Sequence, residues 1–259
     1  MEFLPLPAFQ DNYIWVIFES SGGCVVIDPE QAEPVLAFLQ EKSLTLKAIL
    51  ITHHHADHVG GIAQLLQHAD VPVFGPAREI IPHLTRPLHE GDALHLTIPA
   101  LDIQVMDVPG HTAGHIAYYC PHTEPPLLFA GDTLFNGGCG RLFEGTAAQM
   151  LASLDRLGAL PDATQLWCAH EYTLANLYFA RSLTPDDPSL AEYIQWATQQ
   201  RARHLPTLPS TLATQKTINP FLNIDKPVLK HLLDKDGKAT RAERFATLRQ
   251  WKDVFRSAV

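Results

Sequence analysis

Long apolar runs and an excess of positive charge are both missing from this chain. No stretch approaches the roughly 18 apolar residues that cross a bilayer as a helix, so we expect no membrane partner. The 259 residues carry 19 Lys and Arg against 28 Asp and Glu, a formal charge of −9. Proteins that bind nucleic acid usually present a basic face. The composition therefore predicts a soluble globular protein with no nucleic-acid partner.

Cysteine is scarce, and no two cysteines are spaced as a pair. The four residues are Cys24, Cys120, Cys139 and Cys168, and their wide separation predicts reduced thiols in a cytoplasm instead of a disulfide framework. The first residues lack the basic and apolar segments of a secretory signal. No Gly-x-Ser-x-Gly, Walker or dinucleotide fingerprint is present, so serine hydrolase, nucleotide and NAD chemistry lack support. We expect a cytoplasmic protein that acts as a monomer.

Histidine is concentrated in one stretch, residues 52–58, which reads Thr-His-His-His-Ala-Asp-His. The apolar run before it predicts a buried strand. If the backbone stays extended, alternate side chains share one side, so His53, His55 and Asp57 point together and the imidazoles can converge on one ion. His58 falls where the chain must turn, and there it can aim at a second ion. A chance histidine tract usually lacks such a carboxylate and such a strand-to-helix setting.

Three later residues continue this pattern, because His111, Asp132 and His170 each follow a predicted strand. The loops at strand ends are where rigid scaffolds present functional side chains. Taken singly, each residue more often caps a turn or faces solvent. Together with the histidine stretch they supply enough ligands for two metal ions that share one carboxylate. The four-residue spacing from His111 to His115 suggests that His115 supports the site without being a ligand.

The periodicity predicts strands and helices in the first two thirds of the chain and helices alone after Tyr172. Such a succession favours layers of sheet flanked by helices, followed by a helical domain. We therefore expect two domains, residues 1–172 and 173–259. The predicted strands are 13–18, 24–28, 48–51, 71–74, 101–108, 115–119, 127–130 and 165–168, and the predicted helices are 32–42, 59–69, 146–157, 173–181, 189–204, 224–234 and 240–256.

The histidine stretch and the three later ligands resemble the signature of the metallo-β-lactamase superfamily. Further segments are similar to glyoxalase II, the hydroxyacylglutathione hydrolases, over essentially the whole chain. The resemblance implies an α+β fold, an αββα sandwich followed by a small helical domain. The matching segments are Asp11-Asn12-Tyr13, Gly131-Asp132-Thr133-Leu134-Phe135, Gly138-Cys139-Gly140-Arg141, His170-Glu171-Tyr172-Thr173, Asn219-Pro220-Phe221-Leu222 and the pair Arg249 and Lys252.

The resemblance implies two divalent metal ions. Nitrogen and oxygen ligands suit zinc, iron and manganese alike, and zinc is our first expectation. Asp132 would bridge the ions beside a metal-bound hydroxide, the nucleophile, which makes Asp57 and Asp132 the catalytic carboxylates. The first ion would be held by His53, His55 and His111, and the second by Asp57, His58 and His170.

The resemblance also implies a glutathione site formed by Arg141, Phe143, Tyr172, Arg249 and Lys252. Arg249 and Lys252 are three residues apart on the last predicted helix and so are neighbours there. Without the family match, an ordinary solvated helix face would explain this pair better. Phe143 stands where many relatives carry Tyr, and Asn223 stands where relatives often carry Arg. We expect the apolar side of the last helix to bury Phe245, Leu248, Trp251 and Phe255.

The expected function is hydrolysis of S-(2-hydroxyacyl)glutathione, above all S-D-lactoylglutathione, to glutathione and D-lactate in methylglyoxal detoxification. One alternative is a mononuclear-iron glutathione persulfide dioxygenase of the same fold, which would need no full second metal site and would lack the helical tail. A metal-stabilised binding module without turnover is a second alternative, although an open metal position at strand ends favours catalysis. A lactamase or lactonase would share the fold but would not need the glutathione residues.

Overall fold

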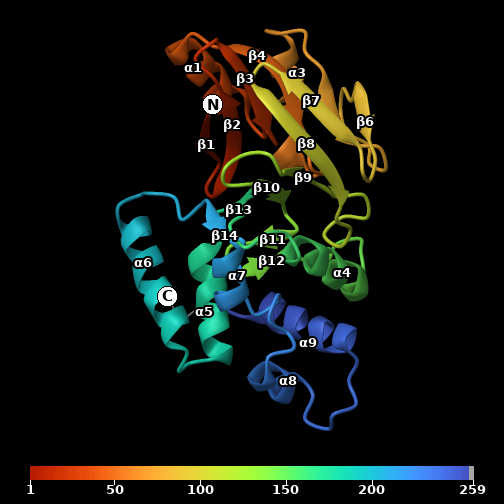
Figure 1. Ribbon diagram of the computed structural model, residues 1–259, viewed down its shortest axis with the longest axis vertical. Coiled ribbons are helices and arrows are strands. Elements are labelled where there is room, and N and C mark those ends of the chain that lie inside the picture. The colour runs from red at the N-terminus through yellow and green to blue at the C-terminus, as the bar shows by residue number, and fades with distance from the viewer. Residues whose placement is uncertain (257–259) are drawn as a thin grey trace. The chain divides into compact units, whose positions relative to one another are not determined.

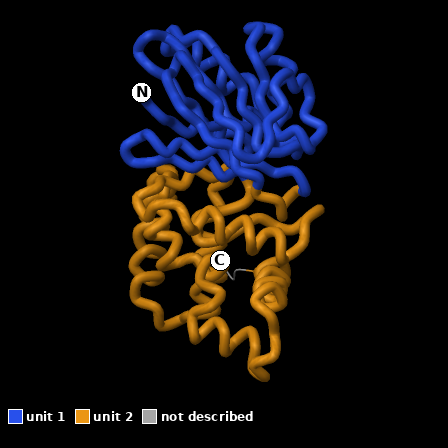
Figure 2. The backbone as a smooth tube through the Cα atoms, turned by 45° about the vertical axis from the view of Figure 1, so that its right-hand side comes forward, with its two compact units in different colours: residues 1–107, 113–131 blue, residues 108–112, 132–259 orange. Residues whose placement is uncertain are grey.

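The computed structural model describes residues 1–256. It contains two compact units, which Figure 2 draws in different colours. Unit 1 comprises Met1–Asp107 and Ala113–Gly131, and unit 2 comprises Val108–Thr112 and Asp132–Val259. This division follows contacts between residues, whereas the expected boundary at 172/173 follows the end of the strand pattern. That boundary stays a prediction, and the last three residues of the expected second domain lie outside the described part of the chain.

A six-stranded sheet opens unit 1, with its strands in sequence order (Figure 1). The first three strands are antiparallel, and the next pairings are parallel. The predicted strands 13–18 and 24–28 correspond to β2 and β3, which form a hairpin with Trp15 opposite Ile27. The edge strands β1 and β6 were not predicted, because both contain proline, which argues against a strand except at a sheet edge. The strands are β1 Glu2–Ala8, β2 Asn12–Phe18, β3 Gly23–Ile27, β4 Thr45–Leu50, β5 Val73–Pro76 and β6 Arg86–Leu88.

Four antiparallel strands in unit 1 form a second run of sheet. They are β7 Ala93–Thr97, β8 Ala100–Asp107, β9 Ile116–Cys120 and β10 Leu127–Gly131. The buried residues of β8 alternate with exposed ones, as expected for a strand with one face on a core, whereas β9 and β10 are buried throughout. Tyr118 of β9 donates a 2.7 Å hydrogen bond to the carbonyl of Ile51, directly after β4, and so ties the two sheets together.

Three helices complete unit 1. Helix α1, Ala32–Lys42, lies where the sequence predicted it and packs Val35 into the core of the first sheet. The helix predicted at 59–69 is instead two short helices, α2 Ala56–Val59 and α3 Ile62–Leu66. Because α2 begins at Ala56, the extended part of the histidine stretch ends at His55, and Asp57 lies in a helical turn.

Unit 2 holds two short hairpin strands, β11 Leu134–Phe135 and β12 Gly138–Cys139, and most of the helices. Thr146 caps α4 in a capping box with Gln149. The expectation of helices alone after Tyr172 was wrong, since Ser210 and Thr211 form the short strand β14, which pairs with β13. The remaining elements are α4 Ala147–Gly158, β13 Gln165–Cys168, α5 Thr173–Leu183, α6 Pro188–Ala202, α7 Leu212–Ile218, α8 Pro227–Leu233 and α9 Arg241–Val254.

The buried side of α9 differs from the prediction. Phe245 and Leu248 are buried as expected, but Trp251 is 37% exposed and Arg249 is only 6% exposed. Two residues along a helix correspond to about 200°, so burial of Arg249 turns Trp251 toward solvent. A guanidinium can take the buried position here because the Cys139 carbonyl and Asp253 accept its hydrogen bonds.

All four cysteines are free and buried, in agreement with reduced thiols. Burial raises the pKa of each thiol, to about 12 for Cys24, Cys120 and Cys168 and to about 11 for Cys139. Among residues 1–256, none of the helices has the length and apolar character needed to span a membrane.

Candidate metal centre

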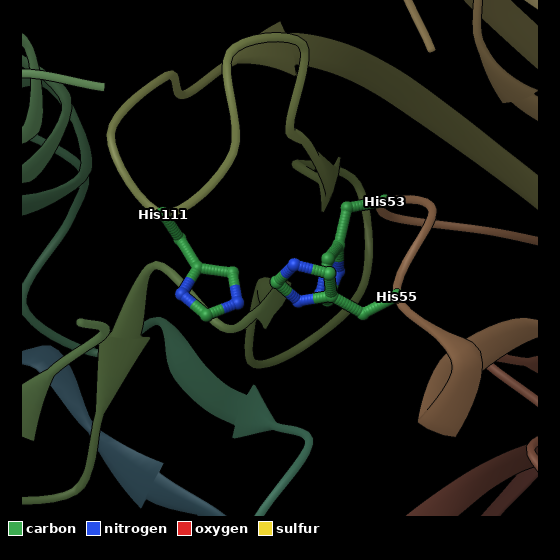
Figure 3. A group of neighbouring side chains, drawn as sticks. All are labelled: His53, His55 and His111. Carbon is green, nitrogen blue, oxygen red and sulfur yellow. The ribbon is translucent and has the colours of Figure 1, made fainter. Parts of the chain in front are cut away.

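The histidine stretch leaves the end of β4 and presents two imidazoles side by side. Nε2 of His53 lies 3.1 Å from Nδ1 of His55, and the two rings meet edge to face. Figure 3 shows the stretch and the two rings close together. The prediction that these two residues point together is confirmed. Asp57 instead lies on α2 beside His58, where one carboxylate oxygen is 3.9 Å from His58 Nε2.

Asp28, which follows β3, orients two of the predicted ligands. Its carboxylate accepts hydrogen bonds from the Thr52 N–H at 2.8 Å and the Thr52 hydroxyl at 2.7 Å, and it lies 3.1 Å from Nδ1 of His58. Because the only hydroxyl proton of Thr52 goes to Asp28, the hydroxyl oxygen accepts from His53 Nδ1, 3.0 Å away. With the proton on Nδ1, Nε2 of His53 is the ring nitrogen that carries a lone pair, as a metal ligand requires.

Two more residues of unit 1 support the stretch. The buried side chain of Asn12, from the Asp-Asn-Tyr segment, donates to the backbone carbonyl of Asp57 at 3.2 Å and to its carboxylate at 3.4 Å. His115 is fully buried, and its ring stacks on His53 with 4.6 Å between centroids. These contacts agree with a supporting role for His115. The sequence singled out neither Asn12 nor Asp28 as support, although a buried aspartate at the end of an apolar strand was a visible signal.

In unit 2, Asp132 lies between two predicted histidine ligands. One carboxylate oxygen is 3.4 Å from His111 Nε2, and the other is 3.3 Å from His170 Nε2. His111 Nδ1 donates to the carbonyl of Arg141 at 2.8 Å, which leaves the Nε2 lone pair facing Asp132. The carboxylate therefore offers each oxygen to a different histidine, the arrangement expected of a ligand shared by two ions.

Glycines allow the unit 2 loops to come this close. A Cβ atom on Gly140 would lie only 1.9 Å from the backbone carbonyl oxygen of Asp132 and 3.1 Å from His111 Nδ1. Gly110, directly before His111, has φ of +152°, which other residues rarely adopt. The Gly-rich segments around the ligands are thus required by close backbone approach.

Among the described residues, three groups of predicted ligands offer atoms that all lie within 4.8 Å of one another and could hold a metal ion. Histidine nitrogens and carboxylate oxygens suit divalent zinc, iron or manganese. The first group is drawn in Figure 3, and every predicted ligand occurs in at least one group. The groups are His53, His55 and His111; His53, His58 and Asp132; and Asp57, His58 and His170.

The predicted substrate residues near the ligands differ in exposure. The side chain of Arg141 is 54% exposed and lies 3.3 Å from the Asp253 carboxylate. Phe143 is 61% exposed and meets the His111 ring edge to face. Tyr172 is 37% exposed, and its ring is parallel to His170 at 4.6 Å. Aromatic faces and a cation are therefore available to a ligand beside His111 and His170.

Arg249 and Lys252 are both partly withdrawn from solvent. Arg249 donates to the Cys139 carbonyl at 2.8 Å and to Asp253 at 3.0 Å, and its guanidinium lies over the Phe221 ring. Lys252 donates to the carbonyl of Ala175 at 3.1 Å. Burial, followed by the charge of Arg249, lowers the pKa of Lys252 from 10.5 to about 8.

Arg141, Arg249, Lys252 and Asp253 form a cationic cluster in unit 2, and Asp253 links its two arginines. It pairs with both Arg141 and Arg249, and it was absent from the predicted site because a lone aspartate on a helix gives no distinguishing signal. The cluster keeps a net positive charge from two guanidiniums and one ammonium against one carboxylate.

The fold and the ligand set define the class of protein. The family model for the metallo-β-lactamase superfamily matches residues 8–170, so the chain belongs to this superfamily. A second family model, described as the hydroxyacylglutathione hydrolase C-terminus, matches residues 171–255. These two matches confirm the expected α+β sandwich with a further C-terminal domain.

Relatives that match over nearly the full chain show which family within the superfamily this protein belongs to. The hydroxyacylglutathione hydrolase of Cupriavidus taiwanensis is 51% identical, over 97% of this chain and 98% of that protein. The protein of the same name from Photobacterium profundum is 50% identical, over 96% and 98%. The chain is a member of the hydroxyacylglutathione hydrolase family, and the persulfide dioxygenase alternative is not favoured.

One solved structure bears on the metals. The structure of TTHA1623 in a di-iron-bound form has a TM-score of 0.58 to this chain at 29% sequence identity. The match covers 86% of this chain and 100% of the TTHA1623 chain. That protein resembles this chain in fold, and its structure is of a di-iron-bound form.

Proposed function

We propose that this protein is a binuclear metal-dependent thioesterase that hydrolyses S-(2-hydroxyacyl)glutathione, S-D-lactoylglutathione in particular, to glutathione and D-lactate. The names of relatives at about half identity over the full chain support this reaction. The observation that carries the metal part of the proposal is Asp132, whose two oxygens face His111 and His170 separately.

Two divalent ions fit the residues present. His53, His55 and His111 would hold one ion, Asp57, His58 and His170 would hold the other, and Asp132 would be shared. Zinc is our first choice, and iron or manganese would fit the same ligands. When bound, such ions lower the pKa of a coordinated water toward neutrality and stabilise developing negative charge on the substrate oxygen. The di-iron form of the relative TTHA1623 supports two ions over one.

The residues around the ligands prepare the site for the ions. Asp28, through Thr52, keeps the proton of His53 on Nδ1, and the Arg141 carbonyl does the same for His111. Both histidines therefore present Nε2 without a rotation or a proton transfer. The leaving thiolate of a thioester has a conjugate pKa of about 8.5, so it departs without a strong protein acid.

The cationic cluster of unit 2 would bind the peptide part of the substrate. Arg141 and Lys252 are the cations that a carboxylate could reach, and Tyr172 would flank the thioester beside His170. Phe143 offers an exposed apolar ring where a tyrosine would add a hydroxyl. Arg249 is buried and already paired, so we assign it to fixing the Cys139 backbone and raising the positive potential.

Hydrolysis of S-D-lactoylglutathione by the purified protein tests the reaction. We expect turnover that is lost on chelation, restored by zinc, and absent in Asp132→Ala. Asp162→Ala is a matched control, because Asp162 pairs with Lys216 at an exposed position and should leave turnover unchanged. Substantial turnover by Asp132→Ala would contradict the shared carboxylate.

A metal count separates the alternatives. Two ions per chain and thioester cleavage support the proposal, whereas one iron per chain with oxidation of glutathione persulfide would support the dioxygenase. A protein that unfolds on chelation and cleaves no thioester would instead be a metal-stabilised binding module. We also propose that the protein is a cytoplasmic monomer, which light scattering and cell fractionation would test.

A further inference from the structure

A buried carboxylate, Glu79, contacts the histidine stretch although it is not a predicted ligand. It follows β5 in unit 1, and its side chain is only 3% exposed. One oxygen accepts the backbone N–H of His54 at 2.6 Å and lies 2.9 Å from His54 Nδ1. The other oxygen accepts the backbone N–H of Gly114 at 3.1 Å. A carboxylate withdrawn from water is costly unless donors surround it, and here three donors do so.

The two backbone N–H groups that donate to Glu79 belong to residues next to the metal-site histidines. His54 separates His53 from His55, so fixing its N–H also fixes the direction of the two flanking imidazoles. Gly114 precedes His115, whose ring stacks on His53. A Cβ atom on Gly114 would lie 2.6 Å from the Glu79 side chain, so only glycine permits this approach. Glu79 thus joins the histidine stretch to the loop that precedes β9.

We propose that Glu79 is a positioning residue for the metal centre, which holds the backbone of the histidine stretch in the geometry that ligation requires before an ion binds. The proposal rests on the proposed function only in requiring that a metal ion occupies His53 and His55. It does not depend on which thioester is cleaved.

Zinc affinity measured by competition with a chromophoric chelator tests this role in the full-length protein. We expect Glu79→Ala to raise the zinc dissociation constant by about ten- to a hundredfold, as loss of a support for a metal ligand usually does. Glu79→Gln keeps one acceptor oxygen but places an amide NH₂ against the other N–H donor, so its loss should be smaller than that of Glu79→Ala. A dissociation constant within about twofold of wild type in both variants would overturn the proposal.

The chain offers a matched control at Glu243. One oxygen of Glu243 accepts both the N–H and the hydroxyl of Thr240, at 2.7 and 2.8 Å, in the capping box of α9. Glu243→Ala should therefore lower the melting temperature without changing zinc affinity. Equal losses of zinc affinity in Glu79→Ala and Glu243→Ala would show that general destabilisation is the cause and would also overturn the proposal.

Two further readouts keep the test decisive. If Glu79→Ala does not fold, the test uses amide hydrogen exchange of residues 52–58 in metal-free Glu79→Gln. We expect this exchange to be faster than in the wild-type protein. An unchanged exchange rate would contradict the positioning role. If wild type binds zinc tightly but cleaves no glutathione thioester, the proposed substrate is wrong while the positioning role still stands on the affinities. If zinc does not bind wild type, the positioning role fails as well.

Discussion

The pH dependence of substrate binding offers a sharp test of Lys252. Its pKa of about 8, lowered by burial and then by Arg249, means that the ammonium loses its proton within a range where the protein can be assayed. At pH 7 about nine tenths of the side chains are charged, and at pH 9 about one tenth are. If Lys252 binds a substrate carboxylate, kcat/KM should fall about tenfold between these pH values, mainly through KM.

The matched control is Lys252→Arg, because a guanidinium stays charged throughout this range. The substrate amine and metal-coordinated water also titrate between pH 7 and 9, but they do so in both proteins. The ratio of the two kcat/KM values therefore isolates Lys252, and the loss of thioester absorbance measures each rate after subtraction of the uncatalysed reaction. A ratio that stays constant from pH 7 to 9 would refute the assignment of Lys252 to the substrate site.

The same shift has a consequence for stability. The folded protein has lost the Lys252 proton above about pH 8, whereas the unfolded chain keeps it until about 10.5. Stability gained from this group should therefore rise as pH increases between these two values. Urea unfolding of wild type and Lys252→Met across this window measures the difference, and a wild-type gain no larger than that of Lys252→Met would contradict the lowered pKa.

Three further substitutions test residues of unit 2. Arg249→Ala should destabilise the protein by about 2 kcal/mol in urea unfolding, because a buried carbonyl loses its charged donor, and a change below about 0.5 kcal/mol would place this residue outside the structural network. Gly140→Ala should abolish metal binding and lower the free energy of unfolding by more than about 3 kcal/mol, because its Cβ would lie 1.9 Å from a carbonyl oxygen. Gly158→Ala, whose Cβ would have its nearest neighbour at 3.6 Å, should retain metal binding and stability. Tyr172→Ala should raise KM and weaken zinc binding through His170, while Tyr172→Phe, which keeps the stacked ring, should preserve zinc affinity.

Much of the candidate site could be predicted because its residues lie in short sequence motifs. The histidine stretch and the three residues after strand ends supplied the candidate ligands, and each of them occurs in a group that could hold a metal ion. Their assignment to two ions comes from the family resemblance and stays a prediction. The error concerned Asp57, which was expected on an extended backbone together with His53. Short helices leave little periodicity in a sequence, so the four residues of α2 could not be distinguished from a continuing strand.

The parts that sequence analysis missed depend on contacts between distant segments. Asp28 and Asn12 support the histidine stretch across 24 and 45 positions respectively. Asp28 carries a local signal, the end of an apolar strand, but nothing near either residue in the sequence names its partner. The burial of Arg249 was missed for the same reason, because its acceptors include the Cys139 carbonyl 110 positions away. Elements with strong local patterns, such as strands β2 and β3 and helix α4, were correctly predicted.

The burial of the cysteines makes a continuous colorimetric assay practical. Cys24, Cys120, Cys139 and Cys168 are all enclosed, and their thiol pKa values of about 11 to 12 leave almost no thiolate at neutral pH. An aromatic disulfide dye added to the cuvette would then report free glutathione as it is released, with almost no background from the native enzyme. The same dye would register a sudden rise in signal if a variant unfolded, so one trace would reveal both turnover and loss of structure.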